Sequence, residues 1–495
     1  MVIVRIDKKS KMPMFKQVIE QLREKIDSQV LEPGYQLPST RQLASKLGVN
    51  RATIYKAYQE LWALGYIESR SGSYSYVRQK RDQITQRDIT KETKIDWSKK
   101  INPRVEEVYE MFGVLNYPFS QISEEFDGID LGRLHPDTRI FPIDEYRKSL
   151  NKVMQQRGDR ILDYGTSRGD VSLREYIAHR LRLHGVTTNK EEILITNGAQ
   201  NAIDLLMKLF TKPGDRVFVE SPTYGMVIPT LKFYGCEIVS IPMKKDGVDL
   251  STIEKEFAKG LPVFFYTMPN FHNPTGITTD QTHREKLIAL FEKFKVPIIE
   301  DAYEEEMKYF GKVPLPIKSM DINQIVIYIG SFSKILFPGI RLGWISANDE
   351  IITRLAMLKR FGDISSTLPA QAALADFCQK GHYEIHIKRI HKVYRRRMLL
   401  AMQQLDKHIK NKNISWIEPN GGYTIWFTFK NTKKSYYEID RIFHKNKVRL
   451  ALGKDFYPDN EPDQHFRIAI ASLNDDEIVE GIKRLSGAIN EIYNI

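Results

Sequence analysis

The N-terminal part of the chain spaces its hydrophobic positions as amphipathic helices do. Across residues 14–30 apolar side chains recur every three or four positions, which predicts a helix that Pro33-Gly34 terminates. A second helix is predicted after Ser39, because Ser39 and Gln42 have the spacing of a capping box. This second helix is short and ends at Gly48.

A third helix is predicted to begin after Asn50, whose side chain can cap it. Its expected core positions keep the helical spacing: Ile54, Tyr58, Leu61 and Leu64. Residues 66–77 then predict a short two-stranded wing that turns at Gly72. The second and third predicted helices are joined by a tight turn, and the third helix has the size that fits a major groove. With the wing, they predict a winged helix-turn-helix over residues 1–77.

Beyond residue 105 the pattern changes to helices that alternate with short apolar runs. The predicted strands are residues 192–195, 216–219, 262–266, 296–300 and 325–329. This alternation predicts an α/β domain built on a mainly parallel sheet. Residues 78–104 are polar and charged without a sustained apolar face, so we expect them to form a mostly irregular linker.

Length and charge indicate that the two parts of the chain have different functions. The 495 residues are enough for about three domains, and the net charge is +12. Residues 1–81 hold 15 Lys and Arg against 7 Asp and Glu, a surplus of eight, which predicts a polyanion-binding head. With two cysteines, no signal-like N-terminus and no apolar run of membrane length, we expect a cytoplasmic protein, and no metal site is predicted.

Polar groups follow the C-terminal ends of the predicted strands, where doubly wound sheets bind ligands. Residues 196–200 lead into a helix whose first N–H groups can hold a phosphate. Tyr224 can stack on a flat ligand, Asp301 offers a carboxylate and Lys334 an amine, and Arg341 follows Lys334. Together these groups predict a site for pyridoxal 5′-phosphate (PLP) bound as a lysine Schiff base.

The predicted winged helix resembles the DNA-binding domain of the GntR regulator family. Two motifs carry the resemblance, Leu-Pro-Ser-x-Arg-x-Leu-Ala at 37–44 and Asn-Arg-x-Thr-x-x-x-Ala-Tyr at 50–58. One position departs from the family pattern, because Tyr74 stands where the wing usually has a second Gly. The implied contacts to double-stranded DNA are Ser39, Arg41, Arg51, Thr53, Tyr55 and Arg70.

From about residue 125 to the C-terminus the chain resembles fold-type I PLP-dependent aminotransferases. Asn-Pro-Thr-Gly at 273–276, Asp-x-Tyr at 301–303 and Ser-x-Ser-Lys at 331–334 carry the resemblance, together with Arg341. This resemblance implies an aminotransferase-like body over residues 105–495. It would consist of a large domain at about 125–365, preceded by residues 105–124, and a small C-terminal α+β domain at about 366–495.

The same resemblance implies a role for each matched residue. Lys334 would form the aldimine and Asp301 would pair with the pyridine nitrogen, and with Tyr303 they are the implied catalytic residues. Asn273 and Tyr303 would hydrogen-bond the 3′-oxygen, while Tyr224 would stack on the ring. The residues implied at the phosphate are Ala199, Gln200, Ser331, Ser333 and Arg341, with Tyr164 reaching it from the partner subunit.

The joined halves resemble the MocR/GabR family of bacterial transcription regulators. The resemblance implies a head-to-tail homodimer and a small amino-compound effector that exchanges with the PLP aldimine. Arg467 would bind the effector carboxylate. Met226 stands where the GABA-responsive member has an Arg, which disfavours GABA and leaves the effector unidentified.

Three functions stay open at this point. The first is an effector-sensing regulator, the second an active aminotransferase with a secondary DNA-binding head, and the third a regulator whose body serves only dimerisation and PLP sensing. Whether the body retains turnover is left open. Arg395-Arg396-Arg397 is predicted to be a solvated helix face with no catalytic role.

Overall fold

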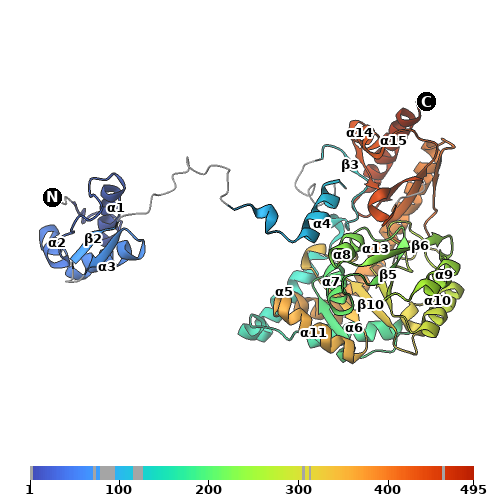
Figure 1. The fold of residues 1–495 in the computed structure, drawn as a ribbon, viewed down its shortest axis with the longest axis horizontal. Helices are drawn as coiled ribbons and strands as arrows, with labels where there is room; N and C mark the ends of the chain where they lie inside the picture. The colour runs from blue at the N-terminus through green and yellow to red at the C-terminus, as the bar shows by residue number, and fades with distance from the viewer. Residues whose placement is uncertain are drawn as a thin grey trace. The chain divides into compact units, whose positions relative to one another are not determined.

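The chain folds into two compact units, Met1–Lys100 and Ile101–Ile495 (Figure 1). The computed structural model describes residues 4–70, 74–78, 95–114, 126–303, 307–310, 314–459 and 463–494, without the side chains of Arg70, Ser98 and 110–114. Each unit has a hydrophobic core of its own.

The N-terminal unit contains three helices and a two-stranded wing. Its elements are α1 (Met14–Asp27), α2 (Thr40–Leu47), α3 (Arg51–Ala63), β1 (Ile67–Arg70) and β2 (Tyr74–Val77). The predicted capping box is confirmed, because Ser39 Oγ accepts from the Gln42 N–H at 3.3 Å and Gln42 Oε1 accepts from the Ser39 N–H at 3.0 Å. Asn50 caps α3 as predicted, through the Ala52 N–H at 2.8 Å.

Two helix ends in this unit differ from the prediction. α1 ends at Asp27, so Val30 lies beyond it and is 68% exposed, while Leu31 fills the core instead. α3 ends at Ala63, and Leu64 is 56% exposed because the chain already turns toward Gly65. The prediction that Leu64 faces the core is therefore wrong.

The wing strands pair antiparallel, from Ile67 opposite Val77 to Arg70 opposite Tyr74. The predicted turn at Gly72 lies outside the described residues. Of the predicted linker, residue 78 and residues 95–104 are described. They include a 3-10 turn, η1 (Trp97–Lys99), and the first residues of α4 (Pro103–Val114).

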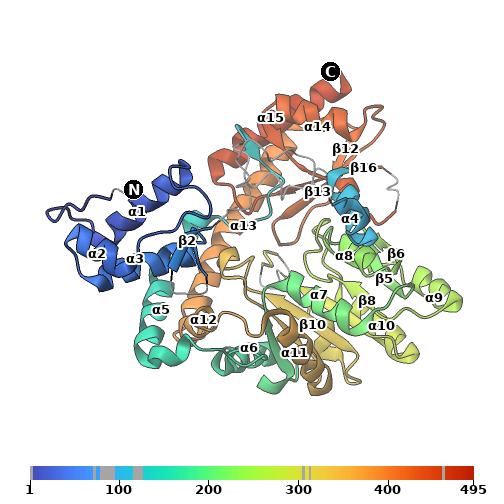
Figure 2. The same cartoon turned by 60° about the vertical axis from the view of Figure 1, so that its left-hand side comes forward.

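The largest sheet described in the second unit has eight strands, and Figure 2 shows it between the helices of the lower part of that unit. Its order is β4-β11-β10-β9-β8-β5-β6-β7. Their bounds are β4 (Ile193–Thr196), β5 (Arg216–Ser221), β6 (Glu237–Lys244), β7 (Gly247–Val248), β8 (Phe265–Thr267), β9 (Ile298–Ala302), β10 (Val326–Ser331) and β11 (Gly343–Ser346). The contiguous strands β10, β9, β8, β5 and β6 are parallel, so the predicted mainly parallel sheet is confirmed, although β6 and β11 were not predicted.

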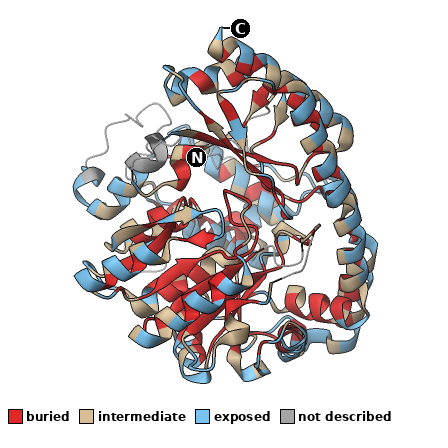
Figure 3. Cartoon of the chain, turned by 90° about the vertical axis from the view of Figure 1, so that its right-hand side faces the viewer, coloured by how far each residue is buried: buried red, intermediate tan, exposed pale blue. Residues whose placement is uncertain are grey.

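Helices cover both faces of this sheet. Alternate residues of one strand enter different cores: Val217 and Val219 of β5 belong to the larger core, while Phe218 packs with α9 and α10. Strands β4, β8, β9, β10 and β11 are accordingly buried along their length, whereas β6 is mostly half-buried (Figure 3). The helices are α5 (Ile143–Arg157), α6 (Val171–Leu183), α7 (Ala199–Phe210), α8 (Val227–Phe233), α9 (Leu250–Lys259), α10 (Gln281–Phe294), α11 (Asp349–Asp363) and α12 (Leu368–Gln379).

A second, antiparallel sheet lies in the C-terminal part, with the order β12-β13-β16-β15. Its strands and helices are β12 (Ile414–Trp416), β13 (Thr424–Phe429), β15 (Ala451–Leu452), β16 (Gln464–Ala469), α13 (His382–His408), α14 (Tyr436–Lys445) and α15 (Asp475–Tyr493). A separate parallel pair joins β3 (Ile129–Asp130) to β14 (Val448–Arg449). The segment after β3 is thereby anchored to the C-terminal part.

Arg395 and Arg396 of the arginine triplet in α13 are exposed as predicted, but the prediction of a solvated face is wrong for Arg397. Arg397 is buried and its Nη2 lies 2.7 Å from Oδ2 of the buried Asp137. Arg396 pairs with Asp475 at 3.1 Å, and Arg395 lies over the ring of Phe310. The sequence could not indicate this, because Asp137 is 260 residues away. None of the helices in the described ranges is long and apolar enough to cross a membrane.

Candidate functional site

The residues predicted to hold PLP follow strands that end at one edge of the large sheet. β5, β8, β9 and β10 are parallel. β4 points the same way, because β4 and β10 both run antiparallel to β11. The loops after these five strands therefore leave the sheet on the same side, which is where parallel sheets place ligand sites.

Asp301 lies near the end of β9 and is only 2% exposed. The hydroxyl of Tyr266, from β8, donates a hydrogen bond to Asp301 Oδ2 at 2.6 Å. Burial raises the pKa of Asp301 to about 6, against the lowering effect of the Tyr266 hydrogen bond, and the nearby charge of Glu220 raises it further.

The other oxygen of this carboxylate, Asp301 Oδ1, is buried and receives no hydrogen bond. Such an acceptor is costly without a donor, and the protonated ring nitrogen of PLP would be one. Burial and then the charge of Asp301 raise the pKa of Tyr224, while Arg341 and Arg467 lower it. The side chain of Tyr224 is therefore close to all three, and these residues fit the pyridine ring of the predicted cofactor.

A cradle for an anion forms where α7 begins. Gly198, the N-cap of α7, has φ +88° and supplies no side-chain cap, so the first N–H groups of the helix are available. Arg341 Nη2 donates to the Asn197 carbonyl at 3.1 Å, and a Cβ at position 198 would lie 2.6 Å from that nitrogen. Gly343 allows the same close approach, because its Cβ would lie 2.9 Å from the Gly198 backbone.

The other residues predicted at the phosphate lie around this cradle. Ala199 is the first residue of α7, while the Gln200 side chain turns to Thr230, with Nε2 at 3.0 Å from its hydroxyl. The Ser333 N–H donates to Ser331 Oγ at 3.1 Å, and the Ser333 hydroxyl is buried without a hydrogen-bond partner. Gln200 can therefore contribute its backbone N–H, and Ser333 its hydroxyl.

Lys334 follows β10, and its Nζ donates to the Leu134 carbonyl at 2.7 Å. The backbone on either side of this amine is held from the C-terminal part of the unit. Tyr423 donates to the Lys334 carbonyl at 3.0 Å, and His386 of α13 donates to the Ile335 carbonyl at 2.8 Å. These contacts fix the loop that carries the amine.

Arg467 lies on β16, with only 8% of its surface exposed, and reaches the same edge. Its Nη1 donates to Asn273 Oδ1 and its Nη2 to the Gly132 carbonyl, both at 2.7 Å. The guanidinium also lies over the ring of Phe456. The structure thus brings together Arg467 and Asn273, which are 194 residues apart.

Two predicted tyrosines are placed differently from the rest. The Tyr303 hydroxyl donates to the Phe271 carbonyl at 2.8 Å, so its proton points to the backbone in this structure. Tyr164 is 78% exposed, and no contact links it to the other site residues of its own chain. Its contact with a partner subunit's phosphate stays a prediction.

Several residues of the site were not predicted from the sequence. The sequence places Tyr266 only in a predicted strand, and no motif marks the segment from Gly132 to His135. Glu220 and His272 form a second buried pair, with His272 Nε2 3.1 Å from Glu220 Oε2. Polar residues inside an apolar strand were the available signal for Tyr266 and Glu220. Among the described residues no three His, Cys, Asp or Glu side chains are arranged to hold a metal ion.

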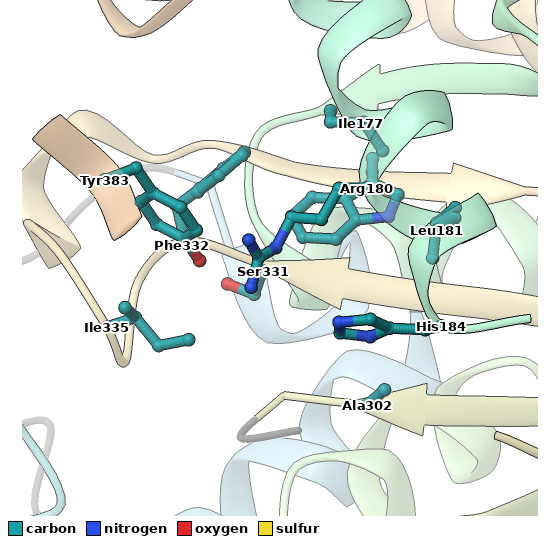
Figure 4. Close-up of a pocket in the computed structure, with 10 residues that line it drawn as sticks. Ile177, Arg180, Leu181, His184, Ala302, Ser331, Phe332, Ile335 and Tyr383 are labelled. Atoms are coloured by element: carbon teal, nitrogen blue, oxygen red, sulfur yellow. The ribbon is translucent and has the colours of Figure 1, made fainter. Parts of the chain in front are cut away.

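A small pocket adjoins this region at the ends of β9 and β10 (Figure 4). Arg180 in its wall lies over the ring of Tyr383 and pairs with Glu384 at 3.6 Å, so its charge is already neutralised. The pocket is lined by Ile177, Arg180, Leu181, His184, Ala302, Ser331, Phe332, Ile335, Trp344 and Tyr383. It includes Ser331 but neither Lys334 nor Asp301, so it borders the candidate site without containing its reactive groups.

In the N-terminal unit the predicted DNA contacts cluster at the starts of α2 and α3. Arg41, Arg51 and Tyr55 are exposed, and Ser39 and Thr53 are half-buried. Arg51 Nε lies 3.4 Å from Thr40 Oγ1, which joins the two helix starts. The side chain of Arg70 lies outside the described residues.

Two family models match the chain, one on each unit. The model for bacterial regulatory proteins of the gntR family matches residues 15–77. The model for aminotransferase class I and II matches residues 129–485, well over half of the chain. Members of the aminotransferase family are PLP-dependent, which confirms the cofactor predicted from the sequence.

Relatives and solved structures agree with both matches. The uncharacterized HTH-type transcriptional regulator YdfD of Bacillus subtilis is 28% identical, over 98% of this chain and 98% of its own length. The probable rhizopine catabolism regulatory protein MocR of Rhizobium meliloti is 27% identical, over 82% of this chain and 79% of its own.

Among solved structures, the α-aminoadipate aminotransferase LysN of Thermus thermophilus has a TM-score of 0.74 and 25% identity. The match covers 81% of this chain and 100% of LysN, which was crystallised with N-(5′-phosphopyridoxyl)-L-leucine. The chain therefore belongs to the aminotransferase class I and II family and, with its N-terminal gntR domain, has the two-domain composition of the MocR-type transcription regulators.

Proposed function

We propose that this protein is a transcription regulator that binds an operator through its N-terminal unit and senses an amino compound through PLP held at Lys334. One observation carries the proposal: Asp301 Oδ1 is a buried acceptor without a donor, at the sheet edge where Lys334 and the α7 cradle also lie. A chain with this site and a gntR domain has the parts of a sensor joined to a DNA reader.

Each end of the cofactor has residues suited to it. Asp301 would hold the ring nitrogen, with Tyr224 against the ring and Asn273 and Tyr303 near the 3′-oxygen. Tyr303 meets this role once its hydroxyl turns from the Phe271 carbonyl. The phosphate would receive the N–H groups of Ala199 and Gln200, the hydroxyls of Ser331 and Ser333, and the guanidinium of Arg341.

PLP, when bound, supplies an aldehyde that condenses with amines and a ring that withdraws electrons. The chain's own groups prepare that reaction. Tyr266 keeps Asp301 oriented and favours its ionised form. The Leu134 carbonyl positions the Lys334 amine, and Arg467 offers its guanidinium to the carboxylate of an incoming amino compound.

On DNA, we propose that Arg41 and Arg51 contact the duplex, with Ser39, Thr53 and Tyr55 at phosphates and Arg70 in the wing. The exposure of Arg41 and Arg51 supports this role. We further propose a head-to-tail homodimer in which Tyr164 reaches the partner's phosphate, for which its 78% exposure leaves it available. A role on the operator implies a cytoplasmic location.

Sensing requires that the effector bind two arrangements of the protein with different affinity. Displacing the Lys334 amine from its present contact changes charge and packing inside the site, which supplies such a difference. The cations at Lys334 and Arg467 favour an effector that carries a carboxylate. The residues for amino transfer are also present, so an active aminotransferase with a secondary head is the alternative function.

Absorbance of the bound cofactor and operator affinity test the proposal together. Lys334→Ala is expected to abolish covalent cofactor attachment, measured by the visible absorbance, while basal DNA affinity stays within about twofold. Wild-type protein is expected to respond spectrally to an amino compound without sustained turnover. Unchanged absorbance in Lys334→Ala would remove Lys334 from the site. Sustained amino transfer to a 2-oxo acid would favour the alternative function.

A further inference from the structure

Arg133 and His135 are two basic residues for which the sequence predicts no role. They lie beside the ligand end of the site, which is the part where Lys334 and Arg467 would receive an amino compound. Arg133 Nε donates to His135 Nδ1 at 2.9 Å. The backbone of the same segment touches both cations that would receive an amino acid. The Gly132 carbonyl accepts from Arg467, and the Leu134 carbonyl accepts from Lys334, each at 2.7 Å.

The hydrogen-bonding character of this pair is fixed by its surroundings. Burial, followed by the charges of Lys334, Arg133 and Arg467, lowers the pKa of His135 to about 4, so the ring is neutral at pH 7. Because Nδ1 accepts from Arg133, the ring proton is on Nε2. The pair therefore presents a guanidinium and a ring N–H, which are both donors.

Among the described residues Arg133 has no carboxylate within ion-pair distance. Burial raises the pKa of the nearby Asp130, while the charges of Arg449 and Arg133 lower that pKa and favour the ionised form of the carboxyl. Asp130, three residues earlier, accepts from the Gly132 N–H at 2.9 Å and lies 3.7 Å from Arg449. With Lys334 and Arg467 nearby, the ligand end of the site holds more positive charge than one carboxylate would balance.

We propose that Arg133 and His135 bind a second acidic group of the effector, which makes the effector class the amino dicarboxylates. The inference rests on the sensing role proposed above. The α-carboxylate would bind Arg467, and the side-chain carboxylate would accept from Arg133 and His135. Position 226 is Met and supplies no cation, so the second cation that we propose for this site is Arg133, in the segment after β3.

The geometry explains why a neutral side chain would bind less well. A ligand that ends in an amide covers the Arg133 guanidinium without pairing its charge. An apolar ligand removes water from the guanidinium and offers it no hydrogen bond. A carboxylate restores two charge-assisted hydrogen bonds, one from each side chain. The discrimination therefore depends on charge more than on size.

Acid and amide pairs of equal size test this assignment. PLP-loaded wild-type protein would be titrated with L-aspartate, L-glutamate and L-2-aminoadipate, and with L-asparagine and L-glutamine, following the cofactor absorbance. We expect at least one acid to bind roughly tenfold or more tightly than the amides. If every acid binds no better than the amides, the inference is wrong.

Three variants test whether Arg133 causes the preference for acids over amides. Arg133→Gln is expected to bring acid and amide affinities to within about twofold, while PLP content stays unchanged. Arg133→Lys keeps the charge but loses the planar fork, and is expected to retain part of the preference. Arg147→Gln, on the exposed face of α5, is the matched control and should leave it intact. An acid preference that survives in Arg133→Gln would overturn the inference.

The outcomes also separate this inference from the sensing role. A spectral response to acids and amides alike would overturn the assignment of Arg133 and leave the sensing role standing. No response to any amino compound, in protein that demonstrably holds PLP, would overturn both.

Discussion

The two units hold their functional cations in opposite ways. Arg41 and Arg51 of the N-terminal unit are exposed, and none of the ion pairs between described residues includes them. Arg467 and Arg397 of the second unit are buried and held by carbonyl, amide or carboxylate oxygens. Exposed cations suit a long polyanion, whose binding is strong at low salt and weak at high salt.

Buried cations suit one small ligand, because their positions are set when the protein folds. This difference has a consequence for mutagenesis. Substitutions of Arg41 and Arg51 should change DNA binding and leave stability almost unchanged. Substitutions of the buried cations should change stability, and those at the ligand site should change both.

The largest expected effect tests the buried side of the comparison. Arg397→Ala leaves the carboxylate of Asp137 buried with only Arg139 as its partner, and should lower the free energy of unfolding by about 3–5 kcal/mol. Arg396→Ala, whose side chain is 65% exposed, should cost less than about 1 kcal/mol. Urea unfolding of both variants measures the difference. Equal losses would contradict the comparison.

A smaller effect concerns the buried carboxylate of the site. Burial raises the pKa of Asp301 from 3.8 to about 6, so the folded state holds this proton more tightly than the unfolded chain. The stability due to Asp301 is therefore fully present below pH 4 and is lost as pH rises to 6, a loss of roughly 3 kcal/mol in cofactor-free protein.

Unfolding free energies of the cofactor-free protein between pH 4 and 7 measure this loss. Asp301→Asn should remove that part of the pH dependence, because the amide does not titrate. Adding PLP to the wild type should restore stability above pH 6, since the ring nitrogen gives Asp301 Oδ1 its missing donor. The same pH slope in Asp301→Asn would assign the dependence to other groups.

The exposed side of the comparison predicts a change in binding alone. Arg51→Ala should weaken operator binding by about 1–3 kcal/mol and reduce the salt dependence, since a cation near the phosphates is lost. The unfolding free energy should change by less than about 0.5 kcal/mol. Titration of labelled operator at several salt concentrations measures the first effect. Arg23→Ala, in α1, is a control that should bind normally.

Features that depend on neighbours in sequence could be predicted. The capping box at Ser39, the cap at Asn50 and the polar groups after five strands all follow from short-range spacing. Leu64 was predicted wrongly because the last residue of a helix pattern depends on where the chain turns. β6 was missed because half-buried residues along it weaken the apolar run.

The contacts that complete the site join residues far apart in the chain, and the sequence does not record them. The Leu134 carbonyl meets Lys334 across 200 residues, and Arg467 meets Gly132 across 335. Tyr266 contacts Asp301 only because β8 and β9 are neighbours in the sheet. Motifs therefore predicted the reactive groups, while the groups that orient them required the fold.

The smallest predicted effect concerns Ser39, which is both a helix cap and an expected phosphate contact. Its Oγ already accepts from the Gln42 N–H, so Ser39→Ala should destabilise α2 by about 1 kcal/mol, seen as faster hydrogen exchange of the α2 amides in the full chain. Ser39→Asp keeps the cap and favours the helix dipole, so exchange should stay near the wild-type rate.

The negative charge of Ser39→Asp would, however, face the phosphates and weaken operator binding more than Ser39→Ala does. The pair therefore separates folding from recognition at one position. If both variants bind the operator as tightly as the wild type does, Ser39 stabilises α2 and does not contact DNA. Ser39 would then be a structural residue, in contrast to the exposed cations Arg41 and Arg51 beside it, which we expect to bind DNA.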